Sequence, residues 1–158
     1  MTLIKNILVP IDFSDYSKNA LKYAIQFAKT FNAKMFLIYV VEPMIYPADF
    51  SMGQVAIPSM DADLQNRAEE ELKNLANSYI DPSLQSETII KTGKPFVEIN
   101  ETAKEIDADL IIMATHGHTG VEHLLFGSTA EKVVRKAPCP VLTLREPIKG
   151  FTFNSKTQ

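Results

Sequence analysis

Five short apolar runs alternate with stretches of helical periodicity along most of the chain. The runs cover positions 6–9, 33–41, 87–91, 109–113 and 141–144 and predict strands. Between them apolar residues recur every three or four positions, as in Ala20, Leu21, Ala24 and Ile25, which predicts helices packed on a sheet. Strands that alternate with helices over short connections favour parallel pairing with right-handed crossovers. The expected fold class is therefore α/β, a doubly wound five-stranded parallel sheet with helices on both faces.

Local signals place the ends of several elements. Ser14 is a suitable N-cap for the first helix, and Pro95 suits the first turn of the third. The second helix is expected over about Asp61–Tyr79 and the fourth over about Ser128–Lys136. The run at 87–91 is more polar than the others, so we expect it near a sheet edge.

One segment interrupts the alternation of strands and helices. Residues 43–61 hold three prolines among aromatic and aliphatic residues, which predicts a long irregular loop. Such a loop could cover a site or contact a partner, or it could be a hinge packed on its own domain, and both interpretations stay open. We expect one domain over residues 1–145 that includes this loop, followed by a polar tail at 146–158.

Composition narrows the class of protein. A chain of 158 residues with 46% hydrophobic content suits one domain with a substantial core. The net charge of -3 argues against a broad nucleic-acid surface, and no apolar run approaches the roughly 20 residues of a membrane span. The start of the chain does not resemble a signal peptide, and the single cysteine fits a reducing compartment. We expect a cytoplasmic protein.

Candidate chemistry concentrates just after the fourth apolar run. Three of the six glycines and all three histidines lie between positions 116 and 127. A strand that ends in a glycine-bearing loop and restarts as a helix is typical of an anion site, because the backbone can approach a phosphate and the helix N-terminus attracts negative charge. The first strand ends in a second unusual connection, Pro10, Ile11 and Asp12. If these two strands are neighbours, both connections face one crevice where the strand order reverses.

Simpler structural roles are available for two of these residues. Ser128 and Glu131 fit a capping box, which would explain both without a ligand but would leave Gly117 and Gly127 unexplained. Asp12 could be a turn residue, since aspartate is common where strands meet helices. Capping and phosphate binding are also compatible at one helix start.

Other chemistries have weaker support in the sequence. His116, His118 and His123 have no cysteine near them and only Glu122 beside them, so no transition-metal site is expected. Cys139 lies between two prolines and is interpreted as a small buried hydrophobe. No serine has the context of a nucleophile elbow, and no catalytic residue is predicted.

Several segments resemble the universal stress protein family. They are ILVPIDFS at 7–14, DLIIMATHG at 109–117, LLFGS at 124–128 and VVRKAPCPVL at 133–142. The order of elements matches that family over roughly residues 3–145. The resemblance implies a Rossmann-like fold of the adenine nucleotide alpha hydrolase-like type.

The resemblance points to the branch of the family that binds ATP. That branch carries a glycine, two residues, a glycine, nine residues, and then a glycine with Ser or Thr. Gly117 and the Gly127-Ser128 pair match the pattern, whereas Ala114 occupies the position of the first glycine. A Cβ there would project near the family's ribose site, so weaker or shifted binding is expected rather than loss.

The resemblance also implies a set of contacts with the nucleotide. Adenine and ribose would meet Pro10, Ile11, Asp12 and Val40, the phosphates would meet Gly117, Gly127, Ser128 and Thr129, and Ala114, Thr115 and His116 would complete the loop. The implied cofactors are ATP, or ADP or AMP, with Mg²⁺ accompanying the nucleotide. The implied partner is a second copy of the chain, paired through the last strand at 141–144.

The functional expectation is an ATP-binding stress-response protein that acts as a nucleotide-dependent regulator or sensor. Two alternatives stay open, namely a dimeric interaction module independent of nucleotide and a weak ATP hydrolase. Phosphoryl transfer needs a positioned base and usually a cationic clamp. Asp12 and His116 are the only candidates, and no lysine lies in the motif, so at most slow hydrolysis is expected.

Overall fold

The structure, a computed structural model, describes residues 3–43, 58–116 and 126–145. The described residues form one parallel sheet of five strands in the order β3-β2-β1-β4-β5. The strands are β1 (Asn6–Pro10), β2 (Lys34–Val41), β3 (Ser86–Thr92), β4 (Leu110–Ala114) and β5 (Val141–Leu144), and the helices are α1 (Asp15–Phe31), α2 (Pro58–Tyr79), α3 (Pro95–Glu105) and α4 (Ser128–Lys136). The predicted doubly wound α/β fold is confirmed.

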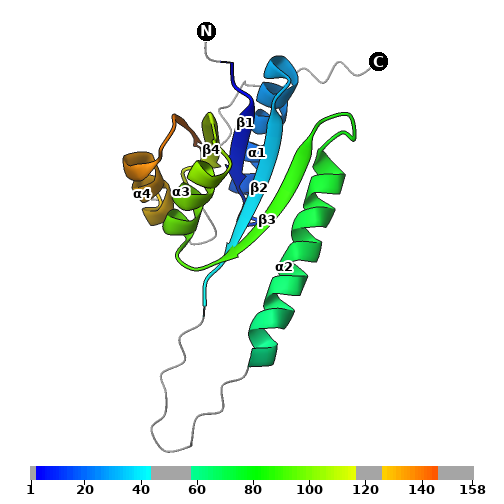
Figure 1. Cartoon of the computed structure of the whole chain (residues 1–158), viewed down its shortest axis with the longest axis vertical. Coiled ribbons are helices and arrows are strands. Elements are labelled where there is room, and N and C mark those ends of the chain that lie inside the picture. The colour runs from blue at the N-terminus through cyan, green and yellow to red at the C-terminus, as the bar shows by residue number, and fades with distance from the viewer. Residues whose placement is uncertain (1–2, 44–57, 117–125, 146–158) are drawn as a thin grey trace, which may run out of the picture.

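Two layers of helices enclose the sheet (Figure 1). Helices α1 and α2 lie on one face, and α3 and α4 lie on the other. The central strand β1 contributes Ile7 and Val9 to the first core and Leu8 to the second, and all three side chains are fully buried. A strand buried on both faces has no polar alternation, which is why this run is continuously apolar.

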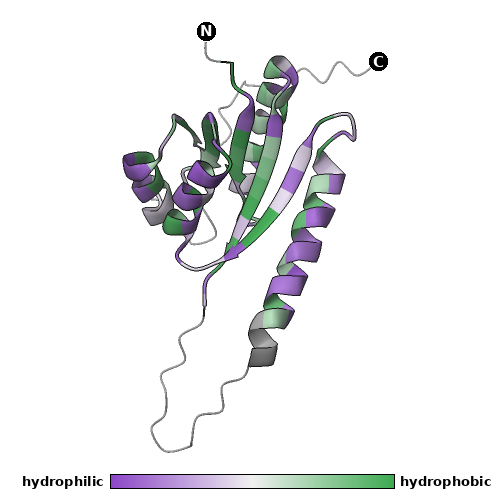
Figure 2. Ribbon diagram, in the orientation of Figure 1, coloured by the Kyte–Doolittle hydropathy of each residue, from purple (hydrophilic) through white to green (hydrophobic). Residues whose placement is uncertain are grey.

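Polar residues lie toward the outside of the two helical layers and on the outer strand (Figure 2). β3 is the edge strand next to β2, as its polar composition predicts, and its first residues are exposed. There Glu87 accepts a hydrogen bond from Lys34 of β2 at 2.8 Å. The opposite edge is formed by β5, whose side chains are half-buried.

The helix after β2 begins earlier than the sequence indicates. α2 starts at Pro58 rather than Asp61, so residues 58–61 belong to the helix and not to an irregular loop. Proline suits the first helical position because the missing N–H would have no partner there in any case. Residues 44–57 of the predicted loop and the predicted tail at 146–158 lie outside the described residues. Within the described part of the chain, no helix is long and apolar enough to span a membrane.

Candidate functional site

The strand order reverses between β1 and β4, because β1 pairs with β2 on one side and with β4 on the other. The carboxyl ends of these strands border a cleft of about 440 Å³, a volume within the usual range for a small-molecule site. Its described lining comprises Pro10, Ile11, Asp12, Ser17, Ile38, Tyr39, Val40, Glu42, Pro95, Ile99, Met113, Ala114, Thr115, His116, Gly127, Ser128, Thr129 and Ala130. The predicted meeting of the two unusual connections at one crevice is confirmed.

A closed set of hydrogen bonds shapes the turn from β1 into α1. The Asp12 carboxylate accepts hydrogen bonds from the backbone N–H and the hydroxyl of Ser14. The Ser14 hydroxyl oxygen caps α1 by accepting from the Ser17 N–H at 3.2 Å, as predicted for this N-cap. The Ser17 hydroxyl donates to the Ser14 carbonyl at 3.0 Å. Asp12 therefore has the turn role considered from the sequence and also lines the cleft.

Phe13 stands between Asp12 and Ser14, and its backbone is left-handed, with φ 64. For a bulky residue this conformation costs about 1–2 kcal/mol. The Phe13 ring lies against Tyr39 of β2, with ring centroids 4.8 Å apart. This contact and the hydrogen bonds of the turn offset the cost, and they fix Asp12 at the rim of the cleft.

Thr115 joins three elements at the end of β4. It is buried, its N–H donates to the Leu144 carbonyl of β5 at 2.9 Å, and its carbonyl accepts from the Gly127 N–H at 2.6 Å. Its hydroxyl lies 2.9 Å from Nδ1 of His116. The His116 ring also lies against Tyr16 of α1, at 5.8 Å between centroids. The imidazole at the cleft wall is therefore held from two sides.

The start of α4 differs from the predicted capping box. Gly127, not Ser128, is the N-cap, with extended backbone angles and a carbonyl that accepts from the Glu131 N–H at 3.0 Å. No side chain caps this helix, and the Glu131 carboxylate pairs instead with Arg135 at 2.9 Å. The backbone N–H groups of the first helical residues have no partner within the helix, so this end of the cleft suits an anion.

A Cβ at position 127 would lie 3.0 Å from the Thr115 carbonyl oxygen. Glycine is therefore favoured here by the close approach of two backbone segments, since its φ of -68 is accessible to any residue. The same approach brings the α4 N-terminus beside the end of β4. This contact spans eleven intervening residues, and no local sequence pattern reveals it.

The part of the lining that follows β1 and β2 is acidic, since it includes Asp12 and Glu42. Burial raises the pKa of the Tyr39 phenol above its ordinary value. The negative charges of Glu71, Asp12 and Glu42 raise that pKa further. The cleft therefore has carboxylates at the ends of β1 and β2 and unpaired N–H groups at the start of α4.

Ten of the eleven predicted site residues line this one cleft, and Gly117 lies outside the described residues. The methyl group of Ala114 is part of the wall, and the cleft keeps its volume beside it. Sequence reasoning missed four polar or turn residues of the lining: Ser17, Tyr39, Glu42 and Pro95. The last three lie at the carboxyl ends of β2 and β3, so the rule used for β1 and β4 places them at the cleft once the strand order is known.

Comparison with known proteins agrees with this architecture. The family model described as the universal stress protein family matches residues 3–145. The universal stress protein MJ0531 of Methanocaldococcus jannaschii is 39% identical over 150 residues, which cover 93% of this chain and 85% of that protein. The chain belongs to the universal stress protein family. The universal stress protein YxiE of Bacillus subtilis is 31% identical over 148 residues, covering 90% of this chain and all of that one.

Solved structures of universal stress proteins share the fold. The structure of MJ0577 from M. jannaschii superposes with a TM-score of 0.75 at 27% identity, covering 92% of this chain and 99% of that one. A universal stress protein from Archaeoglobus fulgidus, solved in complex with dAMP, gives a TM-score of 0.62 at 21% identity, with 90% and 98% coverage. Another, in complex with cAMP, gives 0.60 at 22% identity, with 91% and 98% coverage.

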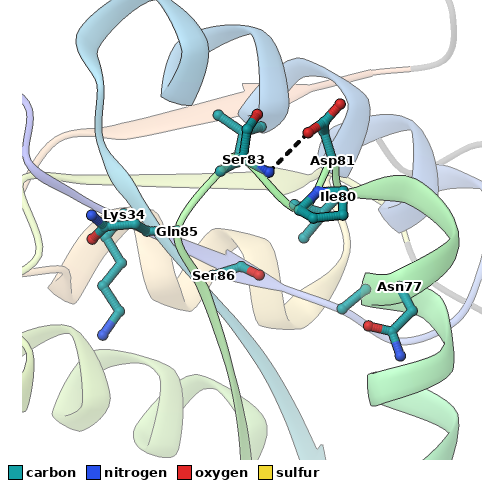
Figure 3. A pocket seen from close by; sticks show the side chains of 10 residues that line it. Lys34, Asn77, Ile80, Asp81, Ser83, Gln85 and Ser86 are labelled. Carbon is teal, nitrogen blue, oxygen red and sulfur yellow. Dashed lines mark hydrogen bonds between the residues drawn. The ribbon is translucent and has the colours of Figure 1, made fainter.

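A larger hollow, of about 650 Å³, lies at the other end of the sheet in this universal stress protein (Figure 3). It is bounded by the end of α2 and by the first residues of β2 and β3, including Lys34 and Ser86. At its rim the Asp81 carboxylate accepts from the Ser83 N–H at 2.8 Å, which lowers the pKa of that carboxyl. In doubly wound sheets ligands bind at the carboxyl ends of the strands, so the smaller cleft is the candidate site.

Two further sequence expectations concern metal and thiol chemistry. Across residues 3–43, 58–116 and 126–145, no group of three or more His, Cys, Asp or Glu could hold a metal ion, and His118 and His123 lie outside these ranges. Cys139 is half-buried and packs against the α3–α4 core. Burial and the charge of Asp109 raise the pKa of its thiol, which makes the reactive thiolate scarce.

Proposed function

We propose that this universal stress protein is a cytoplasmic regulator or sensor that binds adenine nucleotide, with ATP entering together with Mg²⁺. The observation that carries the proposal is the cleft, where the β1–α1 turn and the uncapped N-terminus of α4 face one space. N–H groups at a helix start suit phosphate, and the carboxylate of Asp12 suits the hydroxyl groups of a ribose. Complexes of two other universal stress proteins with dAMP and cAMP support adenine nucleotides as the ligand class.

Isothermal titration with ATP, ADP and AMP in excess Mg²⁺ tests the proposal. Saturable binding of one nucleotide per chain is expected, together with a rise in the unfolding temperature of the protein. Absence of binding by all three nucleotides at millimolar concentration would contradict it. Purified protein should also release adenine nucleotide on denaturation, which mass spectrometry detects.

We further propose that the chain forms a homodimer through β5. This strand pairs only with β4 among the described residues, so no described strand occupies its second edge. Unpaired strand edges favour pairing with another chain. The partner we expect is the β5 of a second copy.

A further inference from the structure

Among the residues that the structure describes, the cleft holds two negatively charged side chains and no fixed positive charge. Its described lining includes Asp12 and Glu42 but no lysine or arginine. The sequence extends this observation to the segments that follow β2 and β4. No lysine or arginine occurs from Met35 to Asn66, or from Glu105 to Glu131.

The lysines closest in sequence to the lining do not alter this balance. Lys18 follows the lining residue Ser17, but its ammonium group faces the carboxylate of Asp15 at 3.9 Å. Lys94 precedes Pro95, is exposed, and is not part of the described lining. Neither residue supplies a cation inside the cleft.

The positive potential for a phosphate therefore comes chiefly from the backbone of α4. A helix N-terminus is equivalent to about half an elementary charge, whereas one phosphate monoester carries about 1.5 to 2 negative charges at neutral pH. A single phosphate group bound at Ser128–Ala130 therefore already carries more negative charge than the helix N-terminus neutralises. Each further phosphate group adds negative charge in a cleft that also holds the carboxylates of Asp12 and Glu42.

The carboxylates near the end of β2 also act on the Tyr39 phenol, which lines the cleft beside them. Three carboxylates, those of Glu71, Asp12 and Glu42, each disfavour a negative charge on this group. A ligand with hydroxyl donors at one end and a single phosphate at the other matches both ends of the cleft. A polyphosphate without a bound cation matches only the end at the start of α4.

We infer that the cleft selects adenine nucleotides by charge, accepting AMP without a metal ion and accepting ATP only as its complex with a divalent cation. This inference rests on the proposed function and specifies the ligand form that the site takes. Mg²⁺ needs no cage of protein ligands for this role, because phosphate oxygens and water supply most of its coordination. Its charge would replace the cation that the lining lacks.

The test is a set of titrations with adenosine, AMP, ADP and ATP at low ionic strength, each in EDTA and in excess Mg²⁺. In EDTA, affinity is expected to fall about tenfold with each phosphate added beyond the first. Excess Mg²⁺ should raise the affinity for ATP by at least about tenfold and leave that for adenosine unchanged. ATP that binds in EDTA as tightly as AMP would overturn the inference while leaving the proposed function intact. Failure of every nucleotide in both conditions would overturn the proposed function itself.

A charge-neutral variant separates this effect from metal binding to the protein. Glu42 is exposed, so Glu42→Gln should leave the fold unchanged and raise the affinity for ATP in EDTA about threefold to fivefold, with a smaller effect on AMP. The matched control is Glu70→Gln, an exposed position on α2 outside the cleft lining, for which no change is expected. Equal responses of the two variants, or equal effects of Glu42→Gln on AMP and ATP, would overturn the inference.

Discussion

Gly127 is the residue on which the geometry of the phosphate end depends. Its N–H donates to the Thr115 carbonyl at 2.6 Å, and an added Cβ would meet the same oxygen at 3.0 Å. A Cβ at this position is crowded against the Thr115 carbonyl, and the further methyl groups of a branched side chain add to the crowding between the start of α4 and the end of β4. We expect Gly127→Val to weaken binding of Mg²⁺–ATP by about 10- to 100-fold, the loss that follows when hydrogen bonds to a charged group are misplaced.

The comparison requires a folded variant and a matched control. Gly127→Ala should show a smaller loss of affinity and a drop of about 1 kcal/mol in the free energy of unfolding, measured by chemical denaturation. Val134→Ala changes an exposed residue of the same helix and should leave the affinity for nucleotide unchanged. Wild-type affinity in Gly127→Val would show that the α4 N-terminus takes no part in binding.

At the scale of elements, hydrophobic periodicity was sufficient to predict the five strands and four helices found among the described residues. The polar edge strand also follows from composition. The pairing of β1 with β4 was only a condition for the expected crevice, and the strand order of the structure meets that condition. The capping box considered as a simpler role for Ser128 and Glu131 does not form, for a physical reason. Gly127 is held by Thr115 from a distant strand end, so a tertiary contact decides where the helix begins.

The β5 edge gives a prediction about assembly. The carbonyls of Pro140 and Leu144 accept from β4, so the backbone groups of Val141 and Thr143 face the open side of the sheet. Thr143→Pro removes one outward N–H and leaves the pairing with β4 in place. We expect a wild-type dimer and a monomeric Thr143→Pro variant by light scattering after size-exclusion chromatography.

Thr143→Val is the control for the side chain at this position. It keeps the backbone N–H and should remain dimeric, since valine favours a strand. A monomeric wild-type protein, or a Thr143→Pro variant that stays dimeric with its fold intact, would exclude β5 pairing as the interface.

At the scale of the whole molecule, the site is a consequence of topology more than of any motif. Residues of the Pro10–Asp12 turn, of 114–116 and of 127–129 were predicted from their place after strands and from the family resemblance. The strand order then brings both connections to one cleft. The acidic end formed by Tyr39 and Glu42 was not predicted, because these residues belong to no motif. Only the strand order shows that the end of β2 lies beside the end of β1.

The raised pKa values of Cys139 and Tyr39 predict how stability depends on pH. The ordinary values are 9.0 and 10.0, and both groups hold their protons more tightly in the folded state than in the unfolded chain. Their contribution is fully present below about pH 8 and is lost as the pH rises through the folded-state values. The free energy of unfolding, measured by chemical denaturation, should therefore decline with alkaline pH.

Single substitutions assign the decline to each group. Cys139→Ala should reduce the slope of the free energy of unfolding against pH from about pH 8 upward, because the thiol titrates first in the unfolded chain. Tyr39→Phe keeps the ring against Phe13 and should reduce the slope only from about pH 9 upward. Subtracting the variant's free energy of unfolding from that of the wild type at each pH removes the contribution of all other titrating groups. Parallel curves for wild type and both variants would show that neither group binds its proton more tightly in the folded protein.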